Sequence, residues 1–284
     1  MASVFDVRVP IRDWVSDAVR FLQVRLAPLF DAFAGGVETV IGTLLAGFEW
    51  LPVLVLIVVL AGLTALLGGW RIGVFALIGL LLVENIGLWQ PFMQTLALVV
   101  VAQLLIVVVG LPLGVLAASS DTVERILKPV LDFMQTMPAF VYLIPAVMFF
   151  GIGLVPGVVA TFVFAIPPLV RLVNLGIRQV PVALVEAAEA FGSTAWQRLV
   201  KVEMPVARPS ILAGLNQSIM LNLSMVVIAG MIGARGLGAE VLRGIQRLNV
   251  GQGFEAGLAV VILAIVLDRV TASFGRSRGS DQTR

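Results

Sequence analysis

The sequence predicts an all-α fold, a polytopic bundle of transmembrane helices. Apolar residues make up 60% of the 284-residue chain before its 28 glycines are counted. A soluble domain has roughly 45–50% with glycine included. Only 13% of the residues are charged, and the mean hydropathy is +1.06. Because a bilayer accepts helices that are apolar on every side, whereas a soluble helix needs a polar face, we expect the chain to reside in a membrane.

The charge balance and the missing residue types exclude several classes of function. The formal net charge is only +2, so the sequence does not indicate binding to nucleic acid. Cysteine and histidine are both absent, which excludes disulfides, Cys/His metal sites, thiol nucleophiles and a histidine base. A phosphate-binding loop needs a Gly-Lys pair, yet Lys128 and Lys201, the two lysines, follow Leu127 and Val200. We therefore expect no enzyme activity, no metal and no cofactor in this chain.

Uncharged runs locate the membrane spans. A spanning helix needs about 20 mostly apolar residues. The run over 133–170 is too long for one helix and is interrupted by Gly151, Gly153, Pro156 and Gly157, so we expect a hairpin of two shorter helices there. With that hairpin, residues 51–284 form a transmembrane domain of about seven spans, over 51–70, 71–88, 95–118, the two helices of 133–170, 209–234 and 254–272.

The first fifty residues are predicted to form a separate N-terminal tail. Within 11–30 the residues Ile11, Trp14, Val15, Ala18, Leu22, Leu26 and Leu29 recur at helical spacing. Asp13, Asp17 and Arg20 lie off that face. The pattern indicates an amphipathic helix that lies on the membrane or against a partner, or one that packs on the rest of the bundle. No cleavable signal peptide is visible before it.

Basic residues near the helix ends predict the orientation, because cytoplasmic loops carry an excess of Lys and Arg. Such residues gather in the segment between the fifth and sixth spans and in the C-terminal tail, at Arg171, Arg178, Arg198, Lys201, Arg208, Arg276, Arg278 and Arg284. We expect a multi-pass protein of the plasma (cytoplasmic or inner) membrane with a cytoplasmic C-terminus and an external N-terminus. Arg235, Arg243 and Arg247 would then lie outside, where only a docking role would account for them.

The long polar segment at about 178–208 interrupts the apolar part of the chain. Pro181 and Pro205 bracket it, and its helix-forming residues are interrupted at Gly192. The pattern predicts two short helices that meet at a glycine. Small residues permit close approach, and Glu186 and Glu189 supply orienting charges, so the segment suits docking into a groove of another protein. A mere connecting loop is the alternative.

The same segment resembles the cytoplasmic signature of binding-protein-dependent ABC importer permeases. That signature is E-A-A, three residues, G, nine residues and I-x-L-P. This chain has Glu186-Ala187-Ala188, Gly192 and 202–205 (Val-Glu-Met-Pro) at that spacing, with Val for Ile and Met for Leu. The resemblance implies the type I importer permease fold. It also implies that Glu186, Ala187, Ala188, Glu189, Gly192 and Pro205 belong to a coupling loop that docks on a separate ATPase, which binds ATP and Mg.

Further blocks, over 132–153, 171–181, 216–238 and 253–269, resemble the glycine betaine/proline betaine permeases of osmoregulated importers. The resemblance implies a homodimer in membrane lipid, served by two ATPase subunits and a separate extracytoplasmic substrate-binding protein. Choline, carnitine, trimethylamine N-oxide or an amino acid could replace glycine betaine as substrate. A secondary transporter or a channel is the more distant alternative, but almost no acids lie within the spans and the coupling loop would have no role.

Two sets of residues are candidates for the transport pathway. On the sixth span Gly214, Gln217, Ser218, Asn222 and Ser224 fall within one half of the helix. Hydrogen bonding between helices is the equally open alternative for them. At the cytoplasmic end of the fourth span lie Gln135, Pro138 and Tyr142, the sole tyrosine. For Tyr142 core packing is the favoured interpretation.

Overall fold

A computed structural model describes residues 10–273, and its elements are helices throughout that range. They are α1 (Ile11–Glu49), α2 (Val53–Gly68), α3 (Trp70–Asn85), α4 (Trp89–Ser119), α5 (Asp121–Thr136), the 3-10 helix η1 (Ala139–Tyr142), α6 (Leu143–Phe150), α7 (Leu154–Arg178), α8 (Val182–Ala190), α9 (Ala195–Arg198), the π-helical turn η2 (Leu199–Glu203), α10 (Met204–Gly230), α11 (Leu237–Gln246) and α12 (Val250–Ser273).

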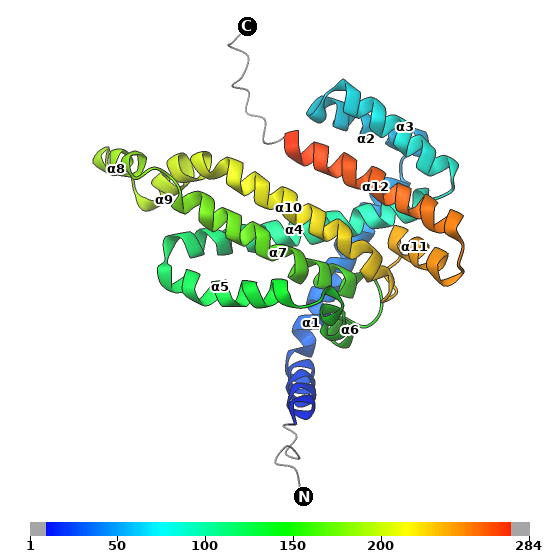
Figure 1. Ribbon diagram of the computed structural model, residues 1–284, viewed down its shortest axis with the longest axis horizontal. Coiled ribbons are helices and arrows are strands. Elements are labelled where there is room, and N and C mark those ends of the chain that lie inside the picture. Colours follow the sequence, from blue (N-terminus) through cyan, green and yellow to red (C-terminus); the bar gives the residue numbers. More distant parts are fainter. Residues whose placement is uncertain (1–9, 274–284) are drawn as a thin grey trace, which may run out of the picture.

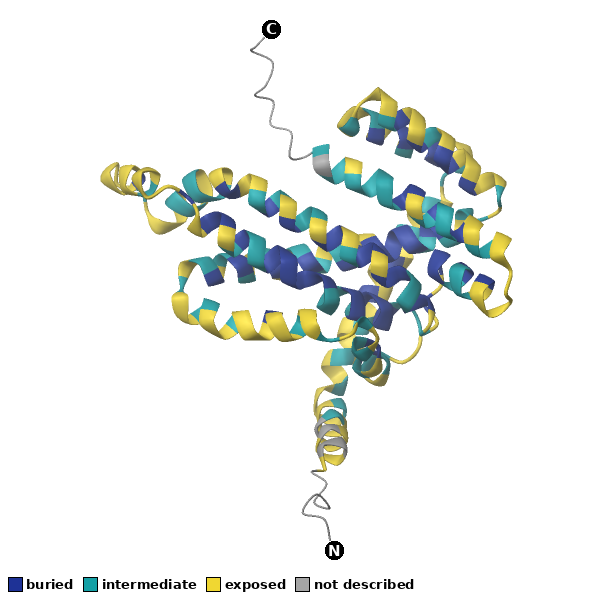
Figure 2. Ribbon diagram, in the orientation of Figure 1, coloured by how far each residue is buried: buried dark blue, intermediate teal, exposed yellow. Residues whose placement is uncertain are grey.

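Helices α4, α7 and α10 form the centre of the bundle and lie side by side along its long axis (Figure 1). Buried residues concentrate on these three helices (Figure 2). The glycine pair Gly110 and Gly114 of α4 faces α7, and a Cβ at Gly114 would lie only 2.5 Å from the Cβ of Val173. Small residues at such a contact let two apolar helices approach closely in a membrane. The α4–α7 contact therefore depends on this pair.

The number of spans is lower than the sequence predicts. Five helices are long and apolar enough to cross a membrane, or six if the bent pair formed by α5 and η1–α6 counts as one span. The predicted spans 51–70 and 71–88 are the 16-residue helices α2 and α3. At 1.5 Å per residue each is about 24 Å long, shorter than a bilayer core of about 30 Å. They form a hairpin that packs on α12 (Figure 1).

Helix α1 occupies most of the predicted N-terminal tail. It is continuous over 39 residues, and its segment Val19–Glu49 is long and apolar enough to span. Val37 and Ile41 are buried against α4 and α7. Asp31 and Glu38 interrupt the apolar run of this segment. Most of the predicted tail is therefore a single helix of the bundle.

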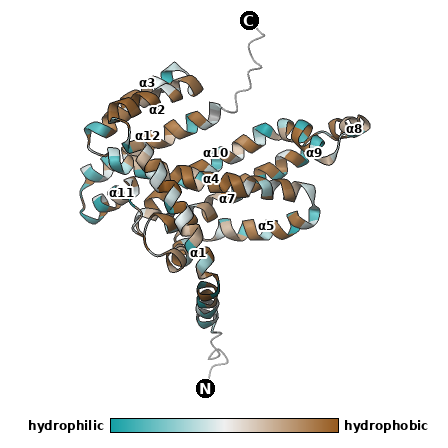
Figure 3. Ribbon diagram, turned by 180° about the vertical axis from the view of Figure 1, so that it is seen from behind, coloured by the Kyte–Doolittle hydropathy of each residue, from teal (hydrophilic) through white to brown (hydrophobic). Residues whose placement is uncertain are grey.

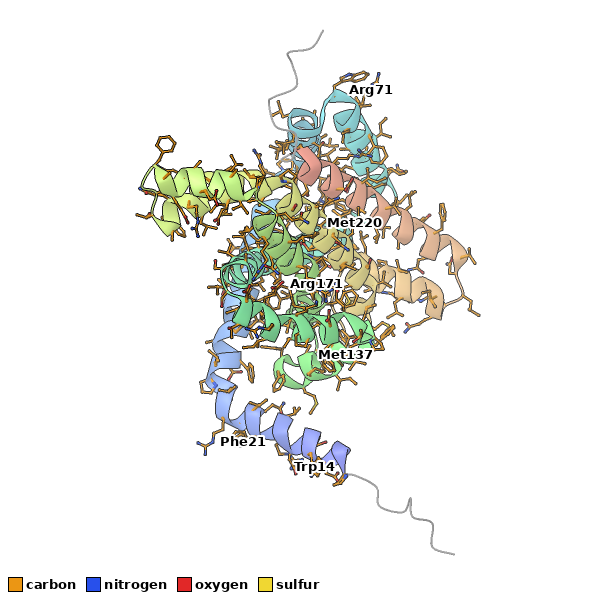
Figure 4. The ribbon with its side chains drawn as sticks, turned by 60° about the vertical axis from the view of Figure 1, so that its left-hand side comes forward. Trp14, Phe21, Arg71, Met137, Arg171 and Met220 are labelled. Atoms are coloured by element: carbon orange, nitrogen blue, oxygen red, sulfur yellow. The ribbon has the colours of Figure 1, made fainter. Side chains whose placement is uncertain are left out.

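The beginning of α1 projects from the bundle and presents apolar side chains. Trp14 and Phe21 are both exposed on this projecting segment (Figure 4). Pro28 lies inside the helix, between the projecting segment and the segment that packs. Asp13, Asp17 and Arg20 are exposed on the same segment, so the amphipathic pattern stays a prediction. The side chains of Ile11, Val15 and Ala18, and the basic residues Arg276, Arg278 and Arg284, lie outside what the structure describes.

The predicted hairpin over 133–170 is partly confirmed. The chain turns at 151–153, where Gly151 and Gly153 both have positive φ, and α7 follows as one long helix. The helix before the turn differs from the prediction. It is a bent pair in which α5 and the η1–α6 segment meet at an angle of 107°. Pro138 at the bend lacks a backbone N–H and disfavours a helical conformation at Met137, which is extended.

Hydropathy differs between these groups of helices. The central helices and the α2–α3 hairpin are predominantly apolar, whereas polar residues gather on α5 and at the start of α1 (Figure 3). Figure 1 shows α8 and α9 at one end of the long axis and the α11–α12 turn at the opposite end. Helices α4, α7 and α10 connect these two ends of the bundle.

Candidate functional site at the α8–α9 segment

The α8–α9 segment is the two-helix structure that the sequence predicts. Helix α8 ends at Ala190, and Gly192 follows with a φ of +76°. The N–H of Gly192 donates to the carbonyl of Glu189 (2.9 Å), and the N–H of Ser193 donates to that of Ala188 (3.0 Å). This is a helix C-terminus closed by a left-handed residue, a position that favours glycine because it has no Cβ. The glycine of the signature therefore sets the angle between the helices.

Helix α9 is short and is fixed by its N-cap. Thr194 and Gln197 form a reciprocal capping box: the N–H of Gln197 donates to the Thr194 hydroxyl (3.3 Å), and the N–H of Thr194 donates to the Gln197 side-chain oxygen (2.9 Å). Two otherwise unpaired backbone N–H groups are thereby satisfied. The helix then continues through the π-helical turn η2 into α10. Any displacement of α9 is thus transmitted to α10 through continuous helix.

Arg198 joins the two short helices to the base of α10. Its guanidinium forms ion pairs with Glu189 of α8 and, at 2.8 Å, with Glu203 of η2. The Arg198 side chain is about one-third exposed, so solvent screens these pairs only in part. Its position as the link between α8 and η2 was not predicted from the sequence. The signal available in the sequence was an arginine, Arg198, with a glutamate on either side of it, Glu189 and Glu203.

The predicted coupling residues are mostly on the surface. Glu186, Ala187, Glu189 and Gly192 are exposed, while Ala188 is buried beneath them. Pro205, also exposed, occupies the first turn of α10. Exposed small and acidic side chains on a projecting element are the arrangement that close docking requires.

Large apolar side chains surround these residues and were not predicted as members of the site. Phe191 is 91% exposed and Trp196 is 71% exposed, with Val182 exposed beside them. Isolated exposed apolar residues are ordinary, but two large aromatic rings on a projecting segment of this kind are typical of residues that anchor an interface. The signal in the sequence was the placement of an aromatic residue on each side of Gly192. The α8–α9 segment thus exposes large apolar side chains together with the acidic side chains of Glu186 and Glu189.

The candidate pathway residues of α10 divide into two groups. Ser218 and Asn222 are fully buried against α4. The Gln103 side chain of α4 donates to the Ser218 hydroxyl (2.8 Å), and the Asn222 amide donates to the carbonyl of Val99 (2.9 Å). These contacts are hydrogen bonds between helices, the alternative interpretation of the pattern. Gly214 is buried as well, against α7.

Gln217 and Ser224 lie on a different side of α10 and are exposed. Met220 lies between them on the same exposed stripe and is visible over the centre of the bundle in Figure 4. The spacing 217, 220, 224 is three and four residues, which aligns side chains along one face of a helix. Of the predicted set on α10, Gln217 and Ser224 alone are exposed.

The second candidate set lies at the bend between α5 and η1. Gln135 and Pro138 are exposed there. The Tyr142 hydroxyl donates to the carbonyl of Met134 near the end of α5, and its ring packs against Phe164 at 6.3 Å between centroids. Tyr142 therefore closes the bend by satisfying a carbonyl left free at the end of a helix.

Comparison with known proteins decides the class of this structure. Residues 110–277 match the family described as the binding-protein-dependent transport system inner membrane component. This range covers α7, the α8–α9 segment, α10, α11 and α12. The chain belongs to this family. It is a transmembrane permease subunit, and family members work with an ATPase and a substrate-binding protein.

Two relatives extend the likeness over nearly the whole chain. The glycine betaine transport system permease protein OpuAB of Bacillus subtilis is 49% identical over 276 residues, which are 96% of this chain and 98% of that protein. The glycine betaine/proline betaine transport system permease protein ProW of Escherichia coli is 47% identical over 279 residues, which are 96% of this chain and 78% of that protein. The N-terminal helix is therefore included in the likeness.

A solved structure confirms the fold. The MetNI methionine ABC transporter in an inward-facing conformation matches with a TM-score of 0.59 at 24% identity, over 65% of this chain and 94% of that one. The predicted type I importer permease fold is thereby confirmed.

Proposed function

We propose that this permease imports glycine betaine or a related methylated amine, driven by a separate ATPase. The observation that carries the proposal is the 49% identity to a glycine betaine permease over 96% of the chain. A permease for trimethylamine N-oxide from Pelagibacter ubique is 38% identical over 91% of this chain, so this second methylated amine is one alternative. Both solutes carry a methylated nitrogen without an N–H donor.

The α8–α9 segment is the element proposed to meet the ATPase. Its exposed Phe191 and Trp196 would enter a cleft of that subunit, and the exposed Glu186 would contact the margin. Movement of the ATPase then reaches α10 through the continuous helix from α9 and through the ion pairs of Arg198. In this proposal ATP and Mg are bound by the ATPase, and the residues of this chain do not contact them.

The pathway is proposed to run between two copies of the chain, past the exposed stripe of Gln217 and Ser224 on α10 and past Gln135 and Pro138 at the bend. A homodimer with two ATPase subunits and a separate binding protein is the assembly that this arrangement suits. With the α8–α9 segment in the cytoplasm, the α11–α12 turn lies outside, at the opposite end of the bundle (Figure 1). An external N-terminus and a cytoplasmic C-terminus also belong to this proposal.

The test is uptake of radiolabelled glycine betaine into proteoliposomes that hold this chain with its copurified ATPase and binding protein. ATP-dependent accumulation that choline does not compete is the expected result. Accumulation without ATP would contradict the coupling to an ATPase. ATP hydrolysis without betaine accumulation would contradict the substrate, and trimethylamine N-oxide would be measured next.

A further inference from the structure

A cavity of about 170 Å³ lies between the C-terminal end of α1, the start of α2 and the start of α4. Its volume is several times the roughly 30 Å³ that one water molecule occupies in the liquid. Glu49 is the one charged residue in its wall, and the other side chains are apolar or aromatic apart from Gln90. The cavity thus combines a single carboxylate with apolar walls, and none of its residues belongs to the coupling segment or to the candidate pathway.

Two of the walls are aromatic. Phe48, which precedes Glu49 on α1, and Trp89, the first residue of α4, line the cavity from different helices. The indole of Trp89 stacks on the buried ring of Phe92, at 6.2 Å between centroids, and this contact fixes its orientation at the wall. The faces of such rings carry partial negative charge and attract cations.

Glu49 is held at the cavity by a hydrogen bond. The side-chain amide of Gln90 donates to one carboxylate oxygen of Glu49 (3.0 Å). None of the salt bridges within residues 10–273 involves Glu49, so no base of that range neutralises its charge. A carboxylate beside aromatic rings favours a cation. A cation whose surface consists of methyl groups also suits the apolar walls, because it has no N–H donor that they would leave unpaired.

The cavity lies at the end of the bundle from which the substrate is proposed to arrive. The N–H of Leu237, at the start of α11, donates to the hydroxyl of Thr95, shortly after the start of α4 (2.8 Å). The start of α4 therefore shares one end of the bundle with α11, opposite to the α8–α9 segment (Figure 1). In the proposed function that end is external.

We propose that this cavity binds the trimethylammonium group of a quaternary ammonium solute, with Phe48 and Trp89 supplying aromatic faces and Glu49 the opposite charge. Gln90 positions the Glu49 carboxylate. The inference rests on the proposed function, because it adds a recognition site for the same class of solute on the external side of the permease. The choline headgroup of a lipid carries the same chemical group, and the experiment separates the two sources.

The experiment measures binding of tetramethylammonium to the permease with its ATPase, without the binding protein, in nanodiscs of phosphatidylethanolamine and phosphatidylglycerol. Saturation-transfer NMR of the methyl protons follows occupancy during a titration. Binding should be saturable, and glycine betaine should compete for it. The uncharged carbon analogue of choline, in which a tert-butyl group replaces trimethylammonium, should compete about tenfold less well, because it has the shape of the cation without its charge.

Single substitutions test each wall. Glu49→Gln keeps the size of the side chain but removes its charge, and Trp89→Leu removes the ring. Each is expected to raise the dissociation constant for tetramethylammonium about tenfold. Trp89→Phe retains an aromatic face and should stay within about threefold of the wild type.

Two matched controls lie outside the cavity. Trp50→Leu removes a tryptophan that follows Glu49 directly, is 84% exposed and does not line the cavity. Glu84→Gln removes the charge of an exposed glutamate near the end of α3. Both controls should bind tetramethylammonium as the wild type does.

Several results would overturn the inference. A wild-type signal that does not saturate removes the site, and equal competition by the uncharged analogue reduces it to an apolar cavity. Dissociation constants within about twofold of the wild type for both Glu49→Gln and Trp89→Leu place the binding elsewhere in the assembly. Loss of binding when phosphatidylcholine replaces phosphatidylethanolamine assigns the cavity to a lipid headgroup.

Uptake of glycine betaine, measured separately, distinguishes failure of this inference from failure of the proposed function. Saturable binding that depends on Glu49 and Trp89, without ATP-dependent uptake, supports the site and contradicts the proposed function. Uptake without saturable binding supports the proposed function and contradicts the site.

Discussion

The two ends of the bundle contain the same turn built from different residues. At the α8–α9 end the left-handed residue is Gly192, and at the α11–α12 end it is Leu248. In both turns the left-handed residue donates to a carbonyl three residues earlier, and the next N–H donates to a carbonyl five residues earlier. The glycine turn follows the general preference at helix ends, whereas the leucine turn is maintained against it.

The two turns differ in the side chain that they expose at the left-handed position. Gly192 has no side chain, and a Cβ there would meet nothing within 4 Å in this chain. The glycine is therefore required by the backbone conformation, and in our proposal also by the close approach of the ATPase. Leu248 offers a side chain in the same open position. One end thus suits a surface that a partner covers closely, whereas the other exposes an apolar side chain in an unfavourable backbone conformation. The predictions below test this contrast, beginning with the largest effect.

Gly192→Trp is expected to abolish coupled uptake. The ring would stand on the surface that the ATPase is proposed to cover, in a backbone conformation that disfavours it. We expect betaine uptake to fall about a hundredfold or more, equal to a loss of about 2.7 kcal/mol of coupling. The chain should still insert and fold, as measured by a yield and an elution profile in detergent that match those of the wild type.

Gly192→Asn is the matched control, because asparagine tolerates a left-handed conformation better than other residues with a side chain. It should retain most of the uptake. Equal losses for the two variants would show that any side chain at this position disrupts the turn itself, and normal uptake for Gly192→Trp would remove the α8–α9 segment from the docking surface.

The α8–α9 end was predictable from the sequence and the other end was not. Pro181, Gly192 and the helix-forming residues between them specify a helix, a turn and a second helix through local preference alone. No local preference indicates a turn at Leu248, since leucine is a helix former. That turn exists because α11 and α12 meet at Gly244 and Gly253, a contact between residues whose placement depends on the whole bundle.

The spans show the same limit. An uncharged run does not fix the length of the helix that it forms, which is why the 16-residue helices α2 and α3 were predicted as spans. In α1 the charges of Asp31 and Glu38 likewise gave no indication that one helix continues over 39 residues. Periodicity found the polar half of α10 but could not tell which side faces α4, because that choice depends on the acceptors that α4 offers, such as the carbonyl of Val99.

The helix that joins the two ends provides the next test. Gln217→Leu changes the exposed stripe of α10, and we expect betaine uptake to fall about three- to tenfold with little change in stability, because surface substitutions rarely exceed about 0.5 kcal/mol. Asn222→Leu removes a buried hydrogen bond to α4 and should lower stability by about 0.6–2 kcal/mol. Uptake per folded transporter and thermal unfolding in detergent separate the two effects. If Asn222→Leu lowered uptake per folded transporter and Gln217→Leu did not, Asn222 and not Gln217 would belong to the pathway.

A smaller effect is expected at Arg198. Arg198→Gln shortens the side chain only slightly but removes its ion pairs with Glu189 and Glu203, which hold α8 against the base of α10. Partly exposed pairs contribute about 1 kcal/mol or less. We therefore expect a loss of about two- to fivefold in uptake per ATP hydrolysed, with the ATPase still bound on copurification. Loss of the ATPase would instead make Arg198 a member of the docking surface.

The smallest expected effect is a gain in stability. Leu248→Gly relieves a left-handed leucine, which costs roughly 1–2 kcal/mol, although glycine offsets some of this by its greater freedom in the unfolded chain. A net gain of about 0.5–1 kcal/mol follows, visible as a small rise in the thermal midpoint of the detergent-solubilised protein. Leu66→Gly, a change of the same side chain inside α2, should lower the midpoint, because glycine is unfavourable in a helix. A rise for Leu248→Gly together with a fall for Leu66→Gly would show that the strain at Leu248 lowers the stability of the folded chain. A fall in its midpoint would mean that the leucine side chain stabilises the turn, and the contrast with Gly192 would then have to be explained by packing.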